Sequence, residues 1–158
     1  MGFYIDNLIE FVLMYQDEIV AAIEDKRNGG NVITGGNSGH SRISDPTANK
    51  AIRNASEVAS VKIAYGAETW GERSTKTIRL PERWVLVSKA VREYHEHNER
   101  TKDFFDRRYN KHEDWRTTCK ELSMSRGVYY AMRTDVIHMA ELYAAHYGAF
   151  DPRDFAKL

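Results

Sequence analysis

The sequence predicts an all-α protein with a long N-terminal helix, a linker and a helical body that ends in a helix-turn-helix. Three observations favour this class. Apolar residues recur at helical spacing along much of the chain, and no proline lies between Thr101 and Pro152. Of the 158 residues, 42% are hydrophobic and 29% are charged, so the chain can form a core and remain soluble.

Charge and cysteine content narrow the possible functions. Lys and Arg total 23 and Asp and Glu total 23, so the formal charge is zero. Any nucleic-acid site must therefore be a local patch. The single cysteine, Cys119, forms no internal disulfide and supports no thiolate zinc site, which favours a reducing, cytoplasmic location. We predict neither a cofactor nor a metal.

The first helix is expected from about residue 3 to Asn28, where Gly29 and Gly30 favour a helix end. Its carboxylates, among them Asp6 and Glu10, are too dense for a membrane span. An apolar stripe with heptad spacing runs along it. That stripe either packs on the rest of the chain or forms a homo-oligomer interface, whose candidate residues are Ile5, Leu8, Val12, Tyr15 and Ile19.

The middle of the chain is expected to contain a linker and a second helix. Residues 29–44 are rich in Gly, Ser and Asn without the GxxxxGK[ST] motif, so we interpret 1–44 as an arm and linker and 45–148 as the body. Ser44–Thr47 is a helix-start signal, and apolar residues such as Ile52 and Ile63 predict a helix behind it. A connection follows to about residue 77, with a brief extended piece at residues 76–80.

Four further helices are expected. Pro81 begins one that reaches about His97, with a buried stripe of Trp84, Val87, Val91 and Tyr94. The others cover residues 101–110, 113–122 and 125–147, separated by short turns. Residues 149–158 are predicted to be a loose tail.

The last two of these helices, at about 113–147, have the pattern of a helix-turn-helix. Thr118 and Leu122 lie at inward positions of the first helix, Met124 can fill the angle between the helices, and Ser125 can cap the second. The opening of the second helix mixes apolar residues with Arg and Tyr. A recognition helix needs this mixture, because one face packs on the core and the other reaches the DNA.

Each candidate DNA contact has a predicted role. Arg126 is suited to a guanine edge, Tyr129 or Tyr130 to a thymine methyl or a phosphate, and Arg133 to backbone or base. Residues 116–133 have a local charge of +3, from four basic residues and Glu121. The alternative is two packed helices with solvated charges. The predicted DNA-binding residues are Arg116, Lys120, Ser125, Arg126, Gly127, Tyr129, Tyr130 and Arg133.

The same residues carry a family resemblance. The run CKELSMSRGVYYAMRTDVI resembles the C-terminal helix-turn-helix of phage late-gene transcriptional regulators of the ArpU and RinA type, which is related in form to region 4 of sigma factors. Ser125, Tyr129, Tyr130 and Arg133 match the family's Ser-x-x-x-Tyr-Tyr-x-x-Arg run, and SDPTANKAIRNA resembles its SDPT helix start. The resemblance implies a phage or prophage activator that binds double-stranded DNA in the cytoplasm of a bacterial host and acts with host RNA polymerase.

Other chemistries are less favoured by the spacing. His95 and His97 point to different faces of a helix, and no HExxH motif is present, so a zinc site is not predicted. Cys119 fits an inert small hydrophobe better than a nucleophile, and no acid–base pair is identifiable, so an enzyme is not expected. Two alternatives remain for the function: a small terminase subunit that binds packaging-site DNA, or a helical interaction protein without a DNA target.

Overall fold

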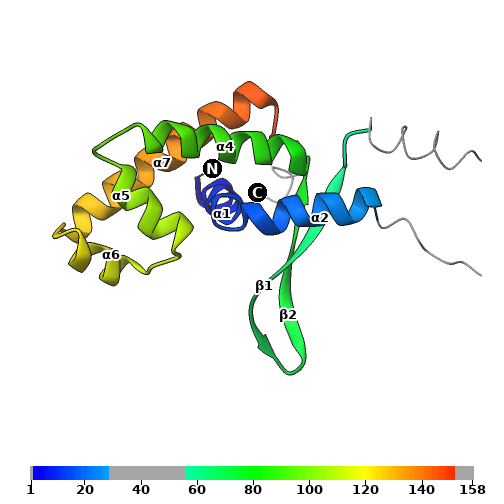
Figure 1. Ribbon diagram of the computed structural model, residues 1–158, viewed down its shortest axis with the longest axis horizontal. Coiled ribbons are helices and arrows are strands. Elements are labelled where there is room, and N and C mark those ends of the chain that lie inside the picture. Colours follow the sequence, from blue (N-terminus) through cyan, green and yellow to red (C-terminus); the bar gives the residue numbers. More distant parts are fainter. Residues whose placement is uncertain (1, 29–55, 152–158) are drawn as a thin grey trace, which may run out of the picture.

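The computed structural model describes residues 2–28 and 56–151, and shows a helical body from which a two-stranded hairpin projects (Figure 1). The all-α prediction is therefore corrected: the described chain is mostly helical but includes one antiparallel sheet. The elements in order are α1 (Gly2–Met14), α2 (Gln16–Asn28), β1 (Ser60–Thr69), β2 (Glu72–Arg79), α4 (Pro81–Glu96), α5 (Lys102–Phe105), the π-helical turn η1 (Asp106–Asn110), α6 (Trp115–Glu121) and α7 (Arg126–Tyr147).

The predicted long N-terminal helix is two helices that meet at a bend at Tyr15. Figure 1 shows α1 nearly end-on while α2 lies lengthwise. Helix bends need a substitute partner for the carbonyls that they turn outward. Arg92 donates to the Leu13 carbonyl at 2.7 Å, and His112 bonds the Met14 carbonyl at 2.9 Å. The bend thus depends on residues far along the chain, which local spacing does not reveal.

The apolar stripe of these two helices is buried within the same chain. Helix α1 contacts α4, α7 and η1, and α2 contacts α4 and β1. Tyr15 is half-buried and packs against the Phe11 ring, with centroids 4.6 Å apart. The residues proposed as an oligomer interface thus have an intramolecular covering, and residues 2–28 belong to the core and do not form a separate arm. The fully covered members of the stripe are Ile5, Leu8, Val12 and Ile19.

The hairpin corrects the prediction of a second helix, whose first part, residues 45–55, lies outside the described residues. Strand β1 begins at Ser60, and Val61 and Ile63 are buried while Lys62 and Ala64 are exposed. This alternation is the period of a strand, and β-branched residues favour it. Val61 pairs with Ile78 in β2, so the predicted extended piece at residues 76–80 does have a partner strand.

Helix α4 confirms the helix predicted from Pro81, and it ends one residue before His97. Trp84, Val87 and Val91 are buried as predicted. Tyr94 is not: its side chain is exposed, and the buried residue of that turn is His95, which stacks on the Phe105 ring with centroids 5.1 Å apart. The prediction is therefore wrong for the last turn of α4, where the buried stripe continues at His95 and not at Tyr94.

The three C-terminal helices lie where the spacing predicts them. Phe104, Phe105 and Tyr109 are buried, as expected for residues that pack the body. One detail differs, because the chain changes from α-helical to π-helical geometry at Asp106. The wider turn lets Arg108 and Tyr109 both reach the Glu10 carboxylate on α1, at 3.3 and 3.4 Å.

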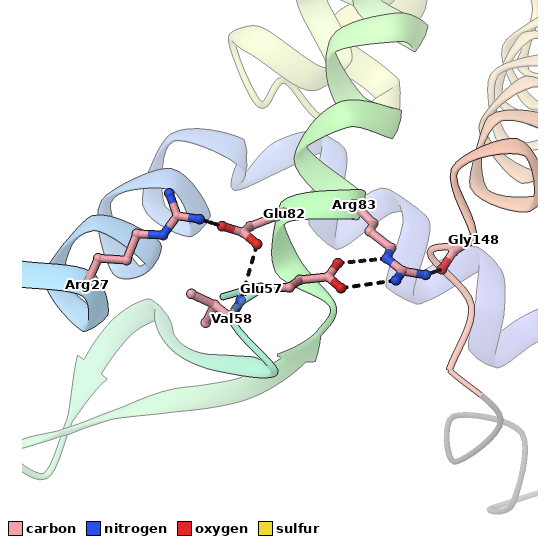
Figure 2. Close-up of polar contacts among 6 residues, drawn as sticks. All are labelled: Arg27, Glu57, Val58, Glu82, Arg83 and Gly148. Carbon is pink, nitrogen blue, oxygen red and sulfur yellow. Dashed lines mark hydrogen bonds and ion pairs between the residues drawn. The ribbon is translucent and has the colours of Figure 1, made fainter. Parts of the chain in front are cut away.

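Residues 149–151 correct the prediction of a loose tail, while residues 152–158 lie outside the described residues. Ala149 and Asp151 are buried, and the Phe150 ring meets the Trp84 ring edge-on at 5.7 Å. Arg83 holds this segment in place. Its guanidinium donates to the Gly148 carbonyl at 2.8 Å and to both oxygens of Glu57 at 2.7 and 3.0 Å. These contacts are drawn in Figure 2.

A second polar junction lies beside the first in Figure 2. The Glu82 carboxylate in the first turn of α4 accepts hydrogen bonds from the Arg27 guanidinium and, at 3.2 Å, from the Val58 backbone N–H. These contacts join the end of α2, the segment before β1 and the start of α4. They fix the base of the hairpin on the helical body.

Gly148→Ala is expected to destabilise the protein by about 1–2 kcal/mol. Gly148 ends α7 with φ +63, and a Cβ there would lie 2.9 Å from Nη1 of Arg83. Urea unfolding measures the loss. Gly127→Ala is the matched control, because its Cβ would meet only Ser125 Oγ at 3.8 Å, within a helix that alanine favours. Equal stability of Gly148→Ala and the wild type would contradict this account of the cap.

Candidate nucleic-acid interface at helices α6 and α7

Helices α6 and α7 each begin at a residue whose side chain caps the first turn. Asp114 accepts a hydrogen bond from the Thr117 backbone N–H at 2.8 Å and begins α6. Hydrogen bonds from Thr117 hold the pKa of Asp114 below its usual range, so the cap is charged at neutral pH. Ser125 accepts from the Val128 N–H at 3.2 Å and begins α7. Asp and Ser are preferred caps because their oxygens satisfy free N–H groups of the first turn.

A short connection, residues 122–125, joins the two helices. Ser123 has φ +50, and the Met124 N–H returns to the Cys119 carbonyl at 3.0 Å. Leu122 and Met124 are half-buried and pack against the core, as does Cys119. Met124 therefore packs inward in the connection between α6 and α7. The buried Thr118 anchors α6 from its inner side.

A group of cations and aromatic rings lies where α6 meets α7. Arg126 lies over two rings, with its Cζ 5.0 Å from the Trp115 centroid and 5.4 Å from the Tyr130 centroid. Arg116 lies over Trp115 at 5.4 Å. Both guanidiniums are exposed, and neither forms an ion pair with a carboxylate of residues 2–28 or 56–151. We call Trp115, Arg116, Arg126 and Tyr130 the cationic–aromatic cluster.

The outer face of α7 beside this cluster is made of small residues. Gly127, Ala131 and Thr134 are exposed and follow one another at helical spacing. The Thr134 hydroxyl donates to the Tyr130 carbonyl at 2.9 Å, so it adds little bulk. Such a face allows the helix backbone to approach a flat or grooved surface closely. Ala131 and Thr134 were missed from the sequence, although their spacing from Gly127 would have indicated them.

Tyr129 does not belong to this surface, which corrects its prediction as a DNA contact. Its side chain is 2% exposed and meets the Phe104 ring edge-on at 5.2 Å. Burial raises the pKa of Tyr129, and its hydroxyl has no hydrogen-bond partner among the described residues. Of the two adjacent tyrosines, only Tyr130 can meet a partner.

Arg133 does not belong to the candidate surface either, which corrects its prediction as a DNA contact. Its Nε and Nη2 each donate to one oxygen of Glu10 at 2.8 Å, and its side chain is mostly buried. This two-point pairing raises the pKa of Arg133, mainly through the hydrogen bonds with Glu10. The residue joins α7 to α1 and is committed to the fold.

The remaining predicted residues keep a place near the surface. Lys120 is exposed on α6, and Ser125 and Gly127 are exposed at the start of α7, where Ser125 acts first as a cap. Glu121 is the acidic residue within α6, and its carboxylate lies 3.5 Å from the Arg107 guanidinium. Three exposed cations, Arg116, Lys120 and Arg126, outnumber the two exposed carboxylates, Asp114 and Glu121, so the patch is locally positive on a neutral chain.

Comparisons with known proteins add no relatives: no family model, no curated protein and no solved structure matches the chain. Among the described residues, no helix is both long and apolar enough to cross a membrane. Residues 2–28 and 56–151 also contain no cluster of three or more His, Cys, Asp or Glu side chains placed to hold a metal ion.

Proposed function

We propose that the chain is a sequence-specific double-stranded DNA-binding protein that regulates transcription, with α7 as its recognition helix. The observation that supports this most is the cationic–aromatic cluster at the exposed start of α7. The sequence of this helix pair resembles the helix-turn-helix of phage late-gene activators, which act with host RNA polymerase. We include in the proposal that the chain activates phage or prophage late genes with host RNA polymerase in the bacterial cytoplasm.

The stacking of Arg126 favours base reading over a diffuse charge contact. An arginine on a free surface loses much rotamer freedom when it binds, and this loss weakens the contact. The rings of Trp115 and Tyr130 restrict the guanidinium before any partner arrives. A restricted, planar guanidinium can donate two parallel hydrogen bonds to guanine O6 and N7 in the major groove.

The other groups then take supporting roles. Arg116 and Lys120 lie on α6, where they are suited to phosphates beside the groove, which position a protein without reading sequence. The small outer face at Gly127, Ala131 and Thr134 lets α7 enter the groove closely. In this arrangement, specificity depends on α7 and general affinity depends on both helices.

Arg126→Ala is expected to weaken binding to the preferred duplex by about 1–3 kcal/mol and to relax the sequence preference. Arg126→Lys keeps the charge but loses the planar fork, so it should restore general affinity without the preference. Lys120→Ala should weaken binding to all duplexes alike and reduce the salt slope by about one. Fluorescence anisotropy with labelled duplexes measures all three.

Lys89→Ala is the matched control, because Lys89 is an exposed lysine on α4, outside this surface. It should bind like the wild type. If Arg126→Ala binds the preferred duplex as tightly as Lys89→Ala does, the assignment of α7 to the groove is wrong. Uniform, salt-sensitive binding without any preferred sequence would favour the packaging role, and no binding at all would favour a helical interaction protein.

A further inference from the structure

The tip of the hairpin holds an unusual residue in an unusual conformation. Trp70 is the most exposed large apolar side chain among the described residues, with a relative exposure of 102%. It has φ +57 and is followed by Gly71 at φ +80, between the paired residues Thr69 and Glu72. Turns of this form favour Asn-Gly, because a side chain other than Asn or Asp is strained at positive φ. A tryptophan here favours neither stability nor solubility, which indicates a function.

The two faces of the hairpin differ in character. One face packs on the body through Val61, Ile63 and Ile78, and on this face Lys76 lies over the Phe11 ring at 5.0 Å. The opposite, outer face is polar. It begins with the cross-strand pairs Ser60–Arg79, Lys62–Thr77 and Ala64–Thr75.

The regularly paired part of the outer face is positively charged. Alternate residues of a strand share a face, so Arg73 lies with Thr75, Thr77 and Arg79 in β2. Its Nε donates to the Gly66 carbonyl at 3.1 Å, which holds the guanidinium close to the tip. In residues 60–65 and 73–78 this face bears Lys62 and Arg73 and no carboxylate.

We propose that the outer face of the hairpin is a second contact with duplex DNA, in which Lys62 and Arg73 pair with backbone phosphates and Trp70 enters a groove. The inference rests on the proposed function, since both surfaces bind the same ligand. Charge complementarity supports it: a narrow ribbon with two cations and exposed threonine hydroxyls matches a line of phosphates. An exposed indole matches the apolar walls and base edges of a groove.

Two carboxylates near the tip allow a test based on the sign of charge. Glu72 shares the face of Ser74 and Lys76, and Glu68 lies in the irregular part of β1, where the register shifts between Tyr65 and Thr69. Neither forms an ion pair with a described residue. If the hairpin lies against DNA, removing these negative charges tightens binding, whereas removing the positive charges weakens it.

The experiment uses the full chain and a labelled duplex, with anisotropy titrations between about 50 and 200 mM salt. Lys62→Gln with Arg73→Gln is expected to weaken binding by roughly tenfold or more and to reduce the salt slope by about two. Glu68→Gln with Glu72→Gln is expected to tighten binding severalfold. Trp70→Asn keeps the turn, because Asn tolerates positive φ, and is expected to weaken binding by about fivefold or more. Lys89→Gln on α4 is the control.

The outcomes separate this inference from the proposed function. If the wild type binds and Arg126→Ala weakens it while all hairpin variants match Lys89→Gln, the inference is wrong and the function of α7 stands. Equal weakening by the basic and the acidic double variants would also overturn it, because contact with phosphates requires opposite signs. If the wild type binds no duplex, the proposed function fails first, and the hairpin would then fit a protein partner.

Discussion

Glu10→Ala is expected to lower the free energy of unfolding by about 3 kcal/mol or more. The Glu10 side chain is only 13% exposed and pairs with Arg133 through two bonds of 2.8 Å and with Arg108 at 3.3 Å. Its removal leaves two mostly buried guanidiniums without their ion-pair partner. The loss far exceeds that of a surface ion pair, because the arginines cannot recover their hydration in place.

Urea unfolding of the variant measures this loss, and Glu24→Ala is the matched control because Glu24 is exposed on α2. The control should change stability by less than about 0.5 kcal/mol. A Glu10→Ala protein as stable as the control would contradict the central place of this ion pair between α1 and α7.

The same network predicts how stability depends on pH. Burial alone raises the pKa of Glu10, but hydrogen bonds with Arg133 and the charges of Arg108 and Arg133 outweigh it, so the pKa is lowered. A lowered pKa stabilises the fold above the unfolded value of about 4.3, and this contribution is lost as the pH falls through the folded value. The wild type should therefore lose more stability than Glu10→Gln between about pH 5 and pH 3. Parallel pH curves for the two proteins would contradict this.

Tyr129→Ala is expected to cost about 3–5 kcal/mol of stability, because it removes a buried aromatic ring that contacts Phe104 in the core. Tyr129→Phe should be neutral or slightly stabilising, since the hydroxyl has no partner among the described residues. It should also bind duplex DNA like the wild type.

Substitution of the neighbouring Tyr130 is expected to affect DNA binding and not stability. Its ring is exposed and restricts Arg126, so Tyr130→Ala should weaken DNA binding with little loss of stability. Thermal unfolding and anisotropy on the same variants separate the two roles. Weakened DNA binding by Tyr129→Phe at unchanged stability would show that Tyr129 is wrongly assigned to the core.

Much of the helical part of the fold could be predicted because its signals are local. Pro81 marks the start of α4, and Asp114 and Ser125 cap α6 and α7 through their own first turns. The bend at Tyr15 and the hairpin could not be predicted in the same way. The bend needs Arg92 and His112, which lie far away in the sequence, and β1 needs its pairing with β2, for example of Val61 with Ile78.

The candidate site was predictable in part for a similar reason. Helical spacing places Arg116 and Lys120 on one side of α6, and the cap at Ser125 places Arg126 in the first turn of α7; the structure keeps all three exposed. Spacing did not exclude Arg133 or Tyr129, because their partners, Glu10 and Phe104, come from other helices. The hairpin face was missed altogether, since it depends on a strand pairing that local sequence did not indicate.

Selection of random duplex DNA by the purified protein, at about 150 mM salt, tests the central claim most directly. At this salt, weak non-specific attraction is largely screened. The proposal predicts an enriched motif that contains a guanine whose selection is lost with Arg126→Ala. Recovery of duplexes without any enriched sequence, or no recovery at all, would contradict the claim that α7 reads DNA.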